Sequence, residues 1–153
     1  MKKSHAQALV LFSGLAIVGL ALVVSHPSKA AISGRGGIPD NPADASCFIT
    51  SGSQSQGTVY QGCPSPRRLC FNPMITNGGN HNISAEGDSG TVSCFATAFY
   101  PNGAQANGTS SVTLVHPVQS TITTIGTVNV PAFGSLSICC DMSFNSILSM
   151  VNF

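Results

Sequence analysis

Six cysteines constrain this chain more than any other feature, because they stand in a small protein with little charge. They are Cys47, Cys63, Cys70, Cys94, Cys139 and Cys140. In an oxidising compartment, an even number of cysteines predicts a framework of disulfides, each worth about 2–4 kcal/mol. Metal ligation is the alternative, but the chain has neither a Cys-x-x-Cys pair nor a His-rich tract. We therefore expect three disulfides and no cofactor.

Residues Met1–Ala30 have the three parts of a cleavable export signal. Two lysines precede an apolar run, Ala6–Val24, and Ser28-Lys29-Ala30 forms a small-x-small cleavage site. The run is long enough to cross a bilayer, so a retained anchor is the alternative. His26-Pro27 and the lack of a following basic cluster favour cleavage after Ala30. We expect an exported protein in the periplasm, at the cell surface or outside the cell, with no membrane contact after cleavage.

Cleavage would remove every lysine and reverse the sign of the net charge. Three cations would remain, Arg35, Arg67 and Arg68, against five anions, Asp40, Asp44, Glu86, Asp88 and Asp141. A chain with no lysine and no basic stripe cannot collect phosphates, so nucleic-acid binding is excluded. The same argument excludes a role on anionic membrane surfaces.

Short β-branched and aromatic segments separated by turn residues dominate the rest of the chain. The predicted strands are Cys47–Thr50, Thr58–Gln61, Gly90–Tyr100, Ser111–Val115, Ser120–Val130, Ser135–Met142 and Ser146–Phe153. No window has a helical period. This pattern predicts an all-β fold, an antiparallel β-sandwich that is immunoglobulin-like in general architecture and stapled by disulfides. A small barrel is the second choice.

The part of the chain after the signal divides at Cys47. Ala31–Ser46 is rich in Gly and Pro and has no apolar period, which predicts a flexible arm. Residues 47–153 form the predicted sandwich domain. Within it, two prolines stiffen a loop at Cys63–Cys70.

Alternation along two predicted strands suggests one disulfide. Cys140 shares a strand face with Leu136, Ile138 and Met142, whereas Cys139 lies on the other face. Cys94 lies on an inward face with its own apolar neighbours. We therefore predict different partners for the two adjacent cysteines, favour the pair Cys94–Cys140, and expect that bridge to join the two sheets. The other four cysteines are left for two peripheral bridges.

Three segments carry a pattern-level resemblance to a known group. They are Thr91–Ala96, Ser110–Leu114 and Gly126–Met142, whose strand and cysteine spacing resembles that of small exported bacterial β-sandwich proteins, mostly uncharacterised. The resemblance covers about half of the mature chain, residues 91–142, and implies a sandwich fold and an envelope or extracellular setting. The doubled Cys139-Cys140 and the additional Cys63 depart from it. It implies no active-site residue.

One motif suggests catalysis, and we expect it to be a turn. Gly87-Asp88-Ser89-Gly90 resembles the nucleophile motif of chymotrypsin-like serine proteases, which need an upstream His base in a domain nearly twice this size. The only preceding histidine of the mature chain is His81, eight residues away. No base, nucleophile and orienting group occur together, so we predict that the protein is not an enzyme.

Metal and carboxylate sites are weaker hypotheses. His81 and His116 are the mature histidines, and both are expected to lie in solvated loops or at a strand end. Glu86 and Asp88 are the nearest approach to the carboxylate pair of a glycosidase. With the oxygens of nearby asparagines they suggest a calcium site, but a polar turn accounts for them better.

Two asparagines, Asn82 and Asn107, begin N-glycosylation patterns (Asn82-Ile83-Ser84 and Asn107-Gly108-Thr109). Such patterns arise easily by chance in a chain rich in Asn, Ser and Thr. The short Lys-Lys start suggests a bacterial source, so we expect neither asparagine to be modified.

Two functions from different classes remain. The first prediction is a non-catalytic structural or assembly component of the bacterial envelope or extracellular matrix, which would self-associate or bind an envelope protein by adding the Ala31–Ser46 arm to a neighbour's sheet. The alternative is a secreted lectin-like or adhesin-like module that binds a glycan or a protein. Its predicted ligand loops contain Asn80, His81, Asn82, Tyr100 and Asn102, with Tyr60 or Tyr100 as the aromatic platform.

Overall fold

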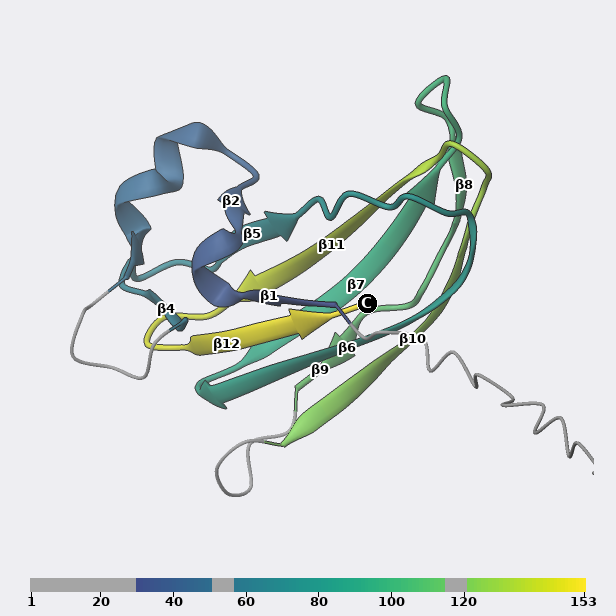
Figure 1. The fold of residues 1–153 in the computed structure, drawn as a ribbon. Helices are drawn as coiled ribbons and strands as arrows, with labels where there is room; N and C mark the ends of the chain where they lie inside the picture. Colours follow the sequence, from purple (N-terminus) through teal and green to yellow (C-terminus); the bar gives the residue numbers. More distant parts are fainter. Residues whose placement is uncertain (1–29, 51–56, 115–120) are drawn as a thin grey trace, which may run out of the picture.

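The computed structural model describes residues 30–50, 57–114 and 121–153, so that all of the predicted signal except Ala30 lies outside them. Within these residues, twelve strands form two antiparallel six-stranded sheets in two layers (Figure 1). This confirms the predicted antiparallel β-sandwich. Across the described ranges, no helix is long and apolar enough to span a membrane.

Sheet A has the strand order β10-β6-β12-β4-β3, and β1 also pairs with β12. Its strands are β1 (Ala31–Ser33), β3 (Phe48–Ile49), β4 (Val59–Gln61), β6 (Gly79–Ser89), β10 (Ile122–Val130) and β12 (Ile147–Asn152).

Sheet B has the order β2-β5-β11-β7-β8, and β9 also pairs with β7. Its strands are β2 (Ile38–Pro39), β5 (Arg67–Phe71), β7 (Val92–Phe99), β8 (Gln105–Gly108), β9 (Val112–Thr113) and β11 (Ser135–Met142).

The core lies between the sheets and follows the alternation of the sequence. On β7 every second residue from Val92 to Ala98 is fully buried, and on β11 the same holds from Leu136 to Met142. From sheet A, Ile83, Val128, Leu148 and Val151 complete the same cluster. Alternating burial of this kind is the expected result of two sheets that each hide one face.

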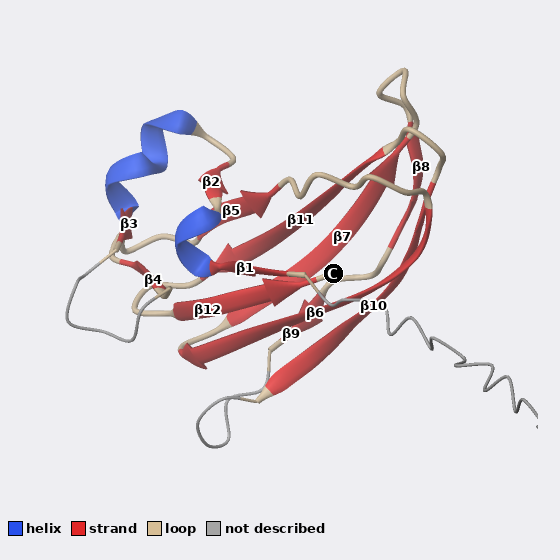
Figure 2. Cartoon of the chain, viewed as in Figure 1, coloured by secondary structure: helices blue, strands red, loops and turns tan. Residues whose placement is uncertain are grey.

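The N-terminal segment is docked on the sandwich, which corrects the prediction of a flexible arm. β1 pairs with β12, and β2 pairs with β5. A short 3₁₀ helix, η1 (Gly34–Gly36), lies between β1 and β2, and a second one, η2 (Pro42–Cys47), follows β2. Figure 2 shows both helices in blue at the end of the sandwich that holds β2 and β5. Gly34 permits this docking, because a Cβ there would lie 2.3 Å from the Leu148 carbonyl oxygen.

Three disulfides join the six cysteines: Cys47–Cys63, Cys70–Cys139 and Cys94–Cys140. The pair Cys94–Cys140 is the one that the sequence favours. However, it does not join the two sheets, because Cys94 and Cys140 are direct cross-strand partners on β7 and β11 of sheet B. Cys70–Cys139 links β11 to its other neighbour, β5.

Seven strands overlap the predicted ones, but others were predicted as loops. β6 is the longest strand of the described residues, although its start, with Asn80 and Asn82, was predicted as a polar loop and its end, with Glu86 and Asp88, as a turn. β5 and β8 also lie where the sequence predicts connections. The ends of two predicted strands fall among residues 115–120, outside the described part of the chain.

Candidate functional site

The outer face of sheet A is organised in rows, because side chains directly opposite one another on antiparallel strands share a face. On β6, the outward residues alternate with inward Ile83, Ala85 and Gly87, all buried. The register places Asn80 opposite Asn129, Asn82 opposite Thr127, and Ser84 opposite both Thr124 and Asn152. The rows change in character from amides and hydroxyls at one end to apolar side chains at the other.

The amide end of this face is a hydrogen-bonded lattice. The Asn129 side-chain amide donates to Oδ1 of Asn80 over 2.7 Å, and the Thr127 hydroxyl donates to Oδ1 of Asn82 over 2.7 Å. Asn107 on β8 exchanges two hydrogen bonds with the Asn129 backbone, which ties the edge of sheet B to the edge of sheet A. The carboxamide nitrogens of Asn80 and Asn82 make no hydrogen bond to a described residue. They remain available as donors.

Glu86 lies in the middle of the face, between its cross-strand partners Ile122 on β10 and Met150 on β12. The residue is only 6% exposed. Among the described residues, none donates a hydrogen bond to its carboxylate or pairs with it. Asp88, the next outward residue, is exposed and accepts a hydrogen bond from the Ser149 hydroxyl.

An apolar row closes the other end of the face. Ile49, Tyr60 and Ile147 are cross-strand partners on β3, β4 and β12. The Tyr60 hydroxyl donates a hydrogen bond to Oδ1 of Asn145, which fixes the direction of the ring. Gly62 packs closely beside them, because a Cβ there would lie only 2.9 Å from the Ile49 side chain and 3.4 Å from the Tyr60 ring.

The structure brings together only part of the ligand loops predicted from sequence. Asn80 and Asn82 lie together on the outer face of sheet A, and Tyr60 lies on the same face. Tyr100 and Asn102 lie instead in the turn between β7 and β8, at the end of the sandwich opposite the short helices (Figure 1). Phe133, which sequence analysis did not single out, is 95% exposed in the neighbouring β10–β11 turn with a φ of 61°.

His81 points away from the asparagines that flank it. Its side chain lines an open cavity of about 210 Å³, together with Met74, Ile75, Asn77 and Phe153. The predicted grouping of Asn80, His81 and Asn82 is therefore split between two sides of β6. His116 lies outside the described residues.

The described residues do not form a serine-protease site. Ser89 and His81 stand eight residues apart on one continuous strand, which separates them by about 26 Å. The Ser89 hydroxyl donates to the Asn145 carbonyl oxygen instead. The described part of the chain also holds no group of three or more His, Cys, Asp or Glu residues that could bind a metal ion.

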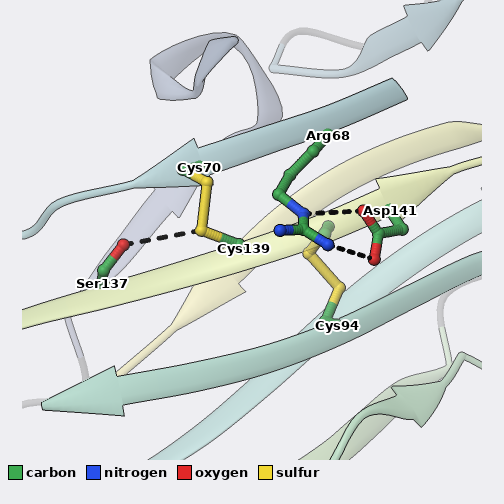
Figure 3. The surroundings of a disulfide bond; sticks show 7 residues. Arg68, Cys70, Cys94, Ser137, Cys139 and Asp141 are labelled. Atoms are coloured by element: carbon green, nitrogen blue, oxygen red, sulfur yellow. Dashed lines mark hydrogen bonds and ion pairs between the residues drawn. A yellow bond between two sulfur atoms is a disulfide. The ribbon is translucent and has the colours of Figure 1, made fainter. Parts of the chain in front are cut away.

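The outer face of sheet B has a different chemistry. Figure 3 shows that Arg68 donates two hydrogen bonds to Asp141, of 2.8 and 3.1 Å. The Arg68 guanidinium also lies 5.1 Å from the centre of the Phe95 ring. The hydrogen bonds to Asp141 raise the pKa of the Arg68 guanidinium above its ordinary value. Cys70–Cys139 lies beside this pair. Asp141 and Phe95 thus hold the Arg68 guanidinium on this face of the sheet.

Comparison with known proteins supports the fold. No protein-family model matches the sequence, and no curated protein sequence matches it. The structure is similar to the C-terminal CBM6 module of LamC, a laminarinase from Zobellia galactanivorans. The TM-score is 0.53 and the identity 13%, over 81% of this chain and 97% of that module.

A second similar structure is the GH26-CBM35 β-(1,4)-mannanase of Podospora anserina, with a TM-score of 0.55 and 14% identity. The match covers 81% of this chain but only 27% of the mannanase, so this chain spans about a quarter of that protein. At these identities the likeness is one of fold. The chain therefore has the β-sandwich fold found in carbohydrate-binding modules.

Proposed function

We propose that this protein is an exported, non-catalytic carbohydrate-binding module whose ligand lies along the outer face of sheet A. The observation that carries the proposal is the continuity of this face, which joins an amide and hydroxyl lattice to an aromatic side chain, Tyr60. The three disulfides support an exported setting, because such bonds persist in oxidising compartments.

The lattice suits the hydroxyl groups of a sugar. A carboxamide offers donors and an acceptor on one rigid group. Thr127 and Asn129 hold the oxygens of Asn82 and Asn80, which orients their free nitrogens as donors. Preorganised groups of this kind lose little side-chain entropy when a ligand binds.

The length of the face favours an extended glycan over a single sugar. Ser89 lies in the same row as Ile147 and Tyr60. It is nine residue steps from Asn80 along β6, a distance of about 30 Å. Tyr60 offers a ring face at the apolar end, where one side of a pyranose could stack. Amphipathic aromatic side chains suit ligands with one apolar and one polar side.

The structural envelope role has less support. That prediction depended on a free arm able to add a strand to a neighbour, but Ala31–Ser46 is paired with strands of its own chain. The structural envelope role therefore stays a prediction.

Affinity electrophoresis of the oxidised protein in gels containing laminarin, β-1,4-mannan or polygalacturonate tests the proposal. We expect retardation by at least one neutral polysaccharide, and about tenfold weaker binding by Asn82→Ala, which removes a donor from the face. Tyr100→Ala, an aromatic change off this face, is the matched control and should bind normally. Loss of binding in Tyr100→Ala with normal binding in Asn82→Ala would move the site to the β7–β8 turn. Failure to bind any glycan would reject the proposal.

A further inference from the structure

We infer that Glu86 determines the specificity of this face: its carboxylate accepts hydrogen bonds from two adjacent hydroxyls of a neutral sugar and excludes acidic glycans. The inference rests on the proposed function and adds to it the ligand class and the residue that selects it.

The first argument is the unusual state of Glu86 in the described structure. A carboxylate in a residue only 6% exposed would ordinarily be paired or hydrogen-bonded, because burying an isolated charge is costly. No described residue supplies such a partner. The chain therefore holds an acceptor without a described partner in the middle of the face, where a ligand can supply the donors.

The second argument is the direction in which the Glu86 side chain points. Ala85 and Gly87, on either side of Glu86, are buried and inward, so Glu86 points outward by strand alternation. Its cross-strand partner Ile122 is 57% exposed, which confirms that this row faces solvent. Glu86 thus belongs to the outer face and not to the core, and a ligand laid across the face would meet it.

The third argument is chemical complementarity along the face. An ionised carboxylate only accepts hydrogen bonds, and its two oxygens match two adjacent hydroxyl donors. The free nitrogens of Asn80 and Asn82 only donate. A sugar hydroxyl can do both, so a chain of neutral sugars satisfies both kinds of group, with the Ile122 and Met150 side chains against its apolar parts.

The charge on the face sets the ligand class. Glu86 and Asp88 are both outward on β6, so a uronic acid or sulfated sugar placed here would meet two like charges. Like charges close together disfavour binding and so act against the wrong ligand. The expected ligand is a neutral, hydroxyl-rich glycan with a pair of adjacent free hydroxyls.

The test compares Glu86→Gln with Asp88→Asn, a matched control that removes the same charge from the exposed neighbour on the same face. Isothermal titration would use laminarin, β-1,4-mannan and polygalacturonate. For the neutral polysaccharide that binds, we expect Glu86→Gln to weaken affinity about tenfold and Asp88→Asn to change it less than about twofold. Glu86→Asp, which withdraws the carboxylate by one methylene, should also weaken binding.

A second measurement does not depend on the glycan. Because no described residue bonds to the Glu86 carboxylate, Glu86→Gln breaks no contact within the described fold and should unfold at about the same denaturant concentration as wild type when no ligand is present. Asp88→Asn should also stay close to wild type, because its amide oxygen can still accept the hydrogen bond from Ser149. Failure of Glu86→Gln to fold would overturn the inference, since it would make Glu86 part of the fold.

The remaining outcomes separate the inference from the proposed function. If the wild type binds a neutral glycan and Glu86→Gln binds it equally well, or Asp88→Asn loses as much affinity, the inference about Glu86 fails and the proposed function stands. Preference of the wild type for polygalacturonate would also overturn the inference alone. If the wild type binds none of the three polysaccharides, both fail.

Discussion

Cys139 and Cys140 are adjacent in the chain, but their sulfurs lie on opposite faces of β11 and bond to different neighbouring strands. Cys139 is opposite Cys70 on β5, and Cys140 is opposite Cys94 on β7, each pair with Cα atoms 4.1 Å apart. That distance is close to the narrow spacing in an antiparallel ladder. The two bridges therefore fasten the central strand of sheet B to both of its neighbours.

This arrangement predicts which cysteine pairs can form alone. Cys70→Ser/Cys139→Ser leaves Cys94 opposite Cys140, so we expect that bridge to form and thiol titration to detect no free thiol. In Cys70→Ser/Cys140→Ser, the remaining Cys94 and Cys139 lie on opposite faces, so both thiols should react. Denaturant unfolding should show that this second variant, which lacks one more bridge, is less stable than the first variant by about 3–4 kcal/mol. Full oxidation of both variants would contradict the strand faces described for β11.

Gly34 controls the docking of the N-terminal segment. We expect Gly34→Ala to destabilise the fold by about 1–3 kcal/mol, because its Cβ would collide with the Leu148 carbonyl oxygen. Hydrogen exchange should speed up at the amides of Met150–Asn152 that bond to β1. Gly103→Ala is the control: its Cβ meets nothing within 4 Å, and only its positive φ is unfavourable. Unchanged exchange in Gly34→Ala would mean that the close contact does not govern docking.

The sequence predicts those strands whose inward positions are clearly apolar. On β7 and β11, β-branched, aromatic and cysteine residues make the alternation plain. The sequence does not reveal β6 because its inward positions hold His81, Ile83, Ala85 and a glycine, of which only Ile83 is strongly apolar, while Asn and Gly at its start are typical of loops. Pairing with β10 on one side and β12 on the other overrides these weak local preferences. The outward alternation of Asn82, Ser84, Glu86 and Asp88 is the signal that could have revealed it.

The ion pair between Arg68 and Asp141 should add little stability. Its side chains are 41% and 42% exposed, and pairs in such positions contribute about 1 kcal/mol or less. The pKa of Arg68 is raised in the folded protein. The stabilisation from its charge is therefore fully present below the ordinary pKa of arginine and is lost only as pH rises through the higher pKa of the folded state. The cost of Arg68→Ala should therefore be constant from about pH 6 to 9. Unfolding curves at several pH values check this, and a marked change within the window would contradict it.

Tyr60 should contribute to binding through its ring. We expect Tyr60→Ala to weaken glycan affinity about tenfold, a typical effect of losing an aromatic contact. Tyr60→Phe loses the hydrogen bond to Asn145 but keeps the ring, so its affinity should change less than about twofold. Titration with the same polysaccharide measures both. An equal loss in the two variants would assign the role to the hydroxyl rather than the ring.

The candidate face shows why sequence reasoning found only some of its residues. The sequence points to Asn80 and Asn82 because polar amides cluster there. Their neighbours Thr127 and Asn129 are more than forty residues away and meet them only through the register of β10 against β6. Tyr60 and Glu86 likewise share a face only because β12 lies between their strands. A site assembled across strands depends on these long-range pairings, which no local pattern encodes.

The most direct test of a carbohydrate-binding face is an NMR titration of the oxidised, ¹⁵N-labelled protein with oligosaccharides of laminarin and β-1,4-mannan. The account predicts saturable shifts that concentrate on outward residues of sheet A, including Asn80, Asn82, Glu86 and Thr127, with sheet B unaffected. Shifts confined to the Tyr100 and Phe133 turns or to the cavity beside His81, or the absence of saturable shifts with every oligosaccharide, would contradict it.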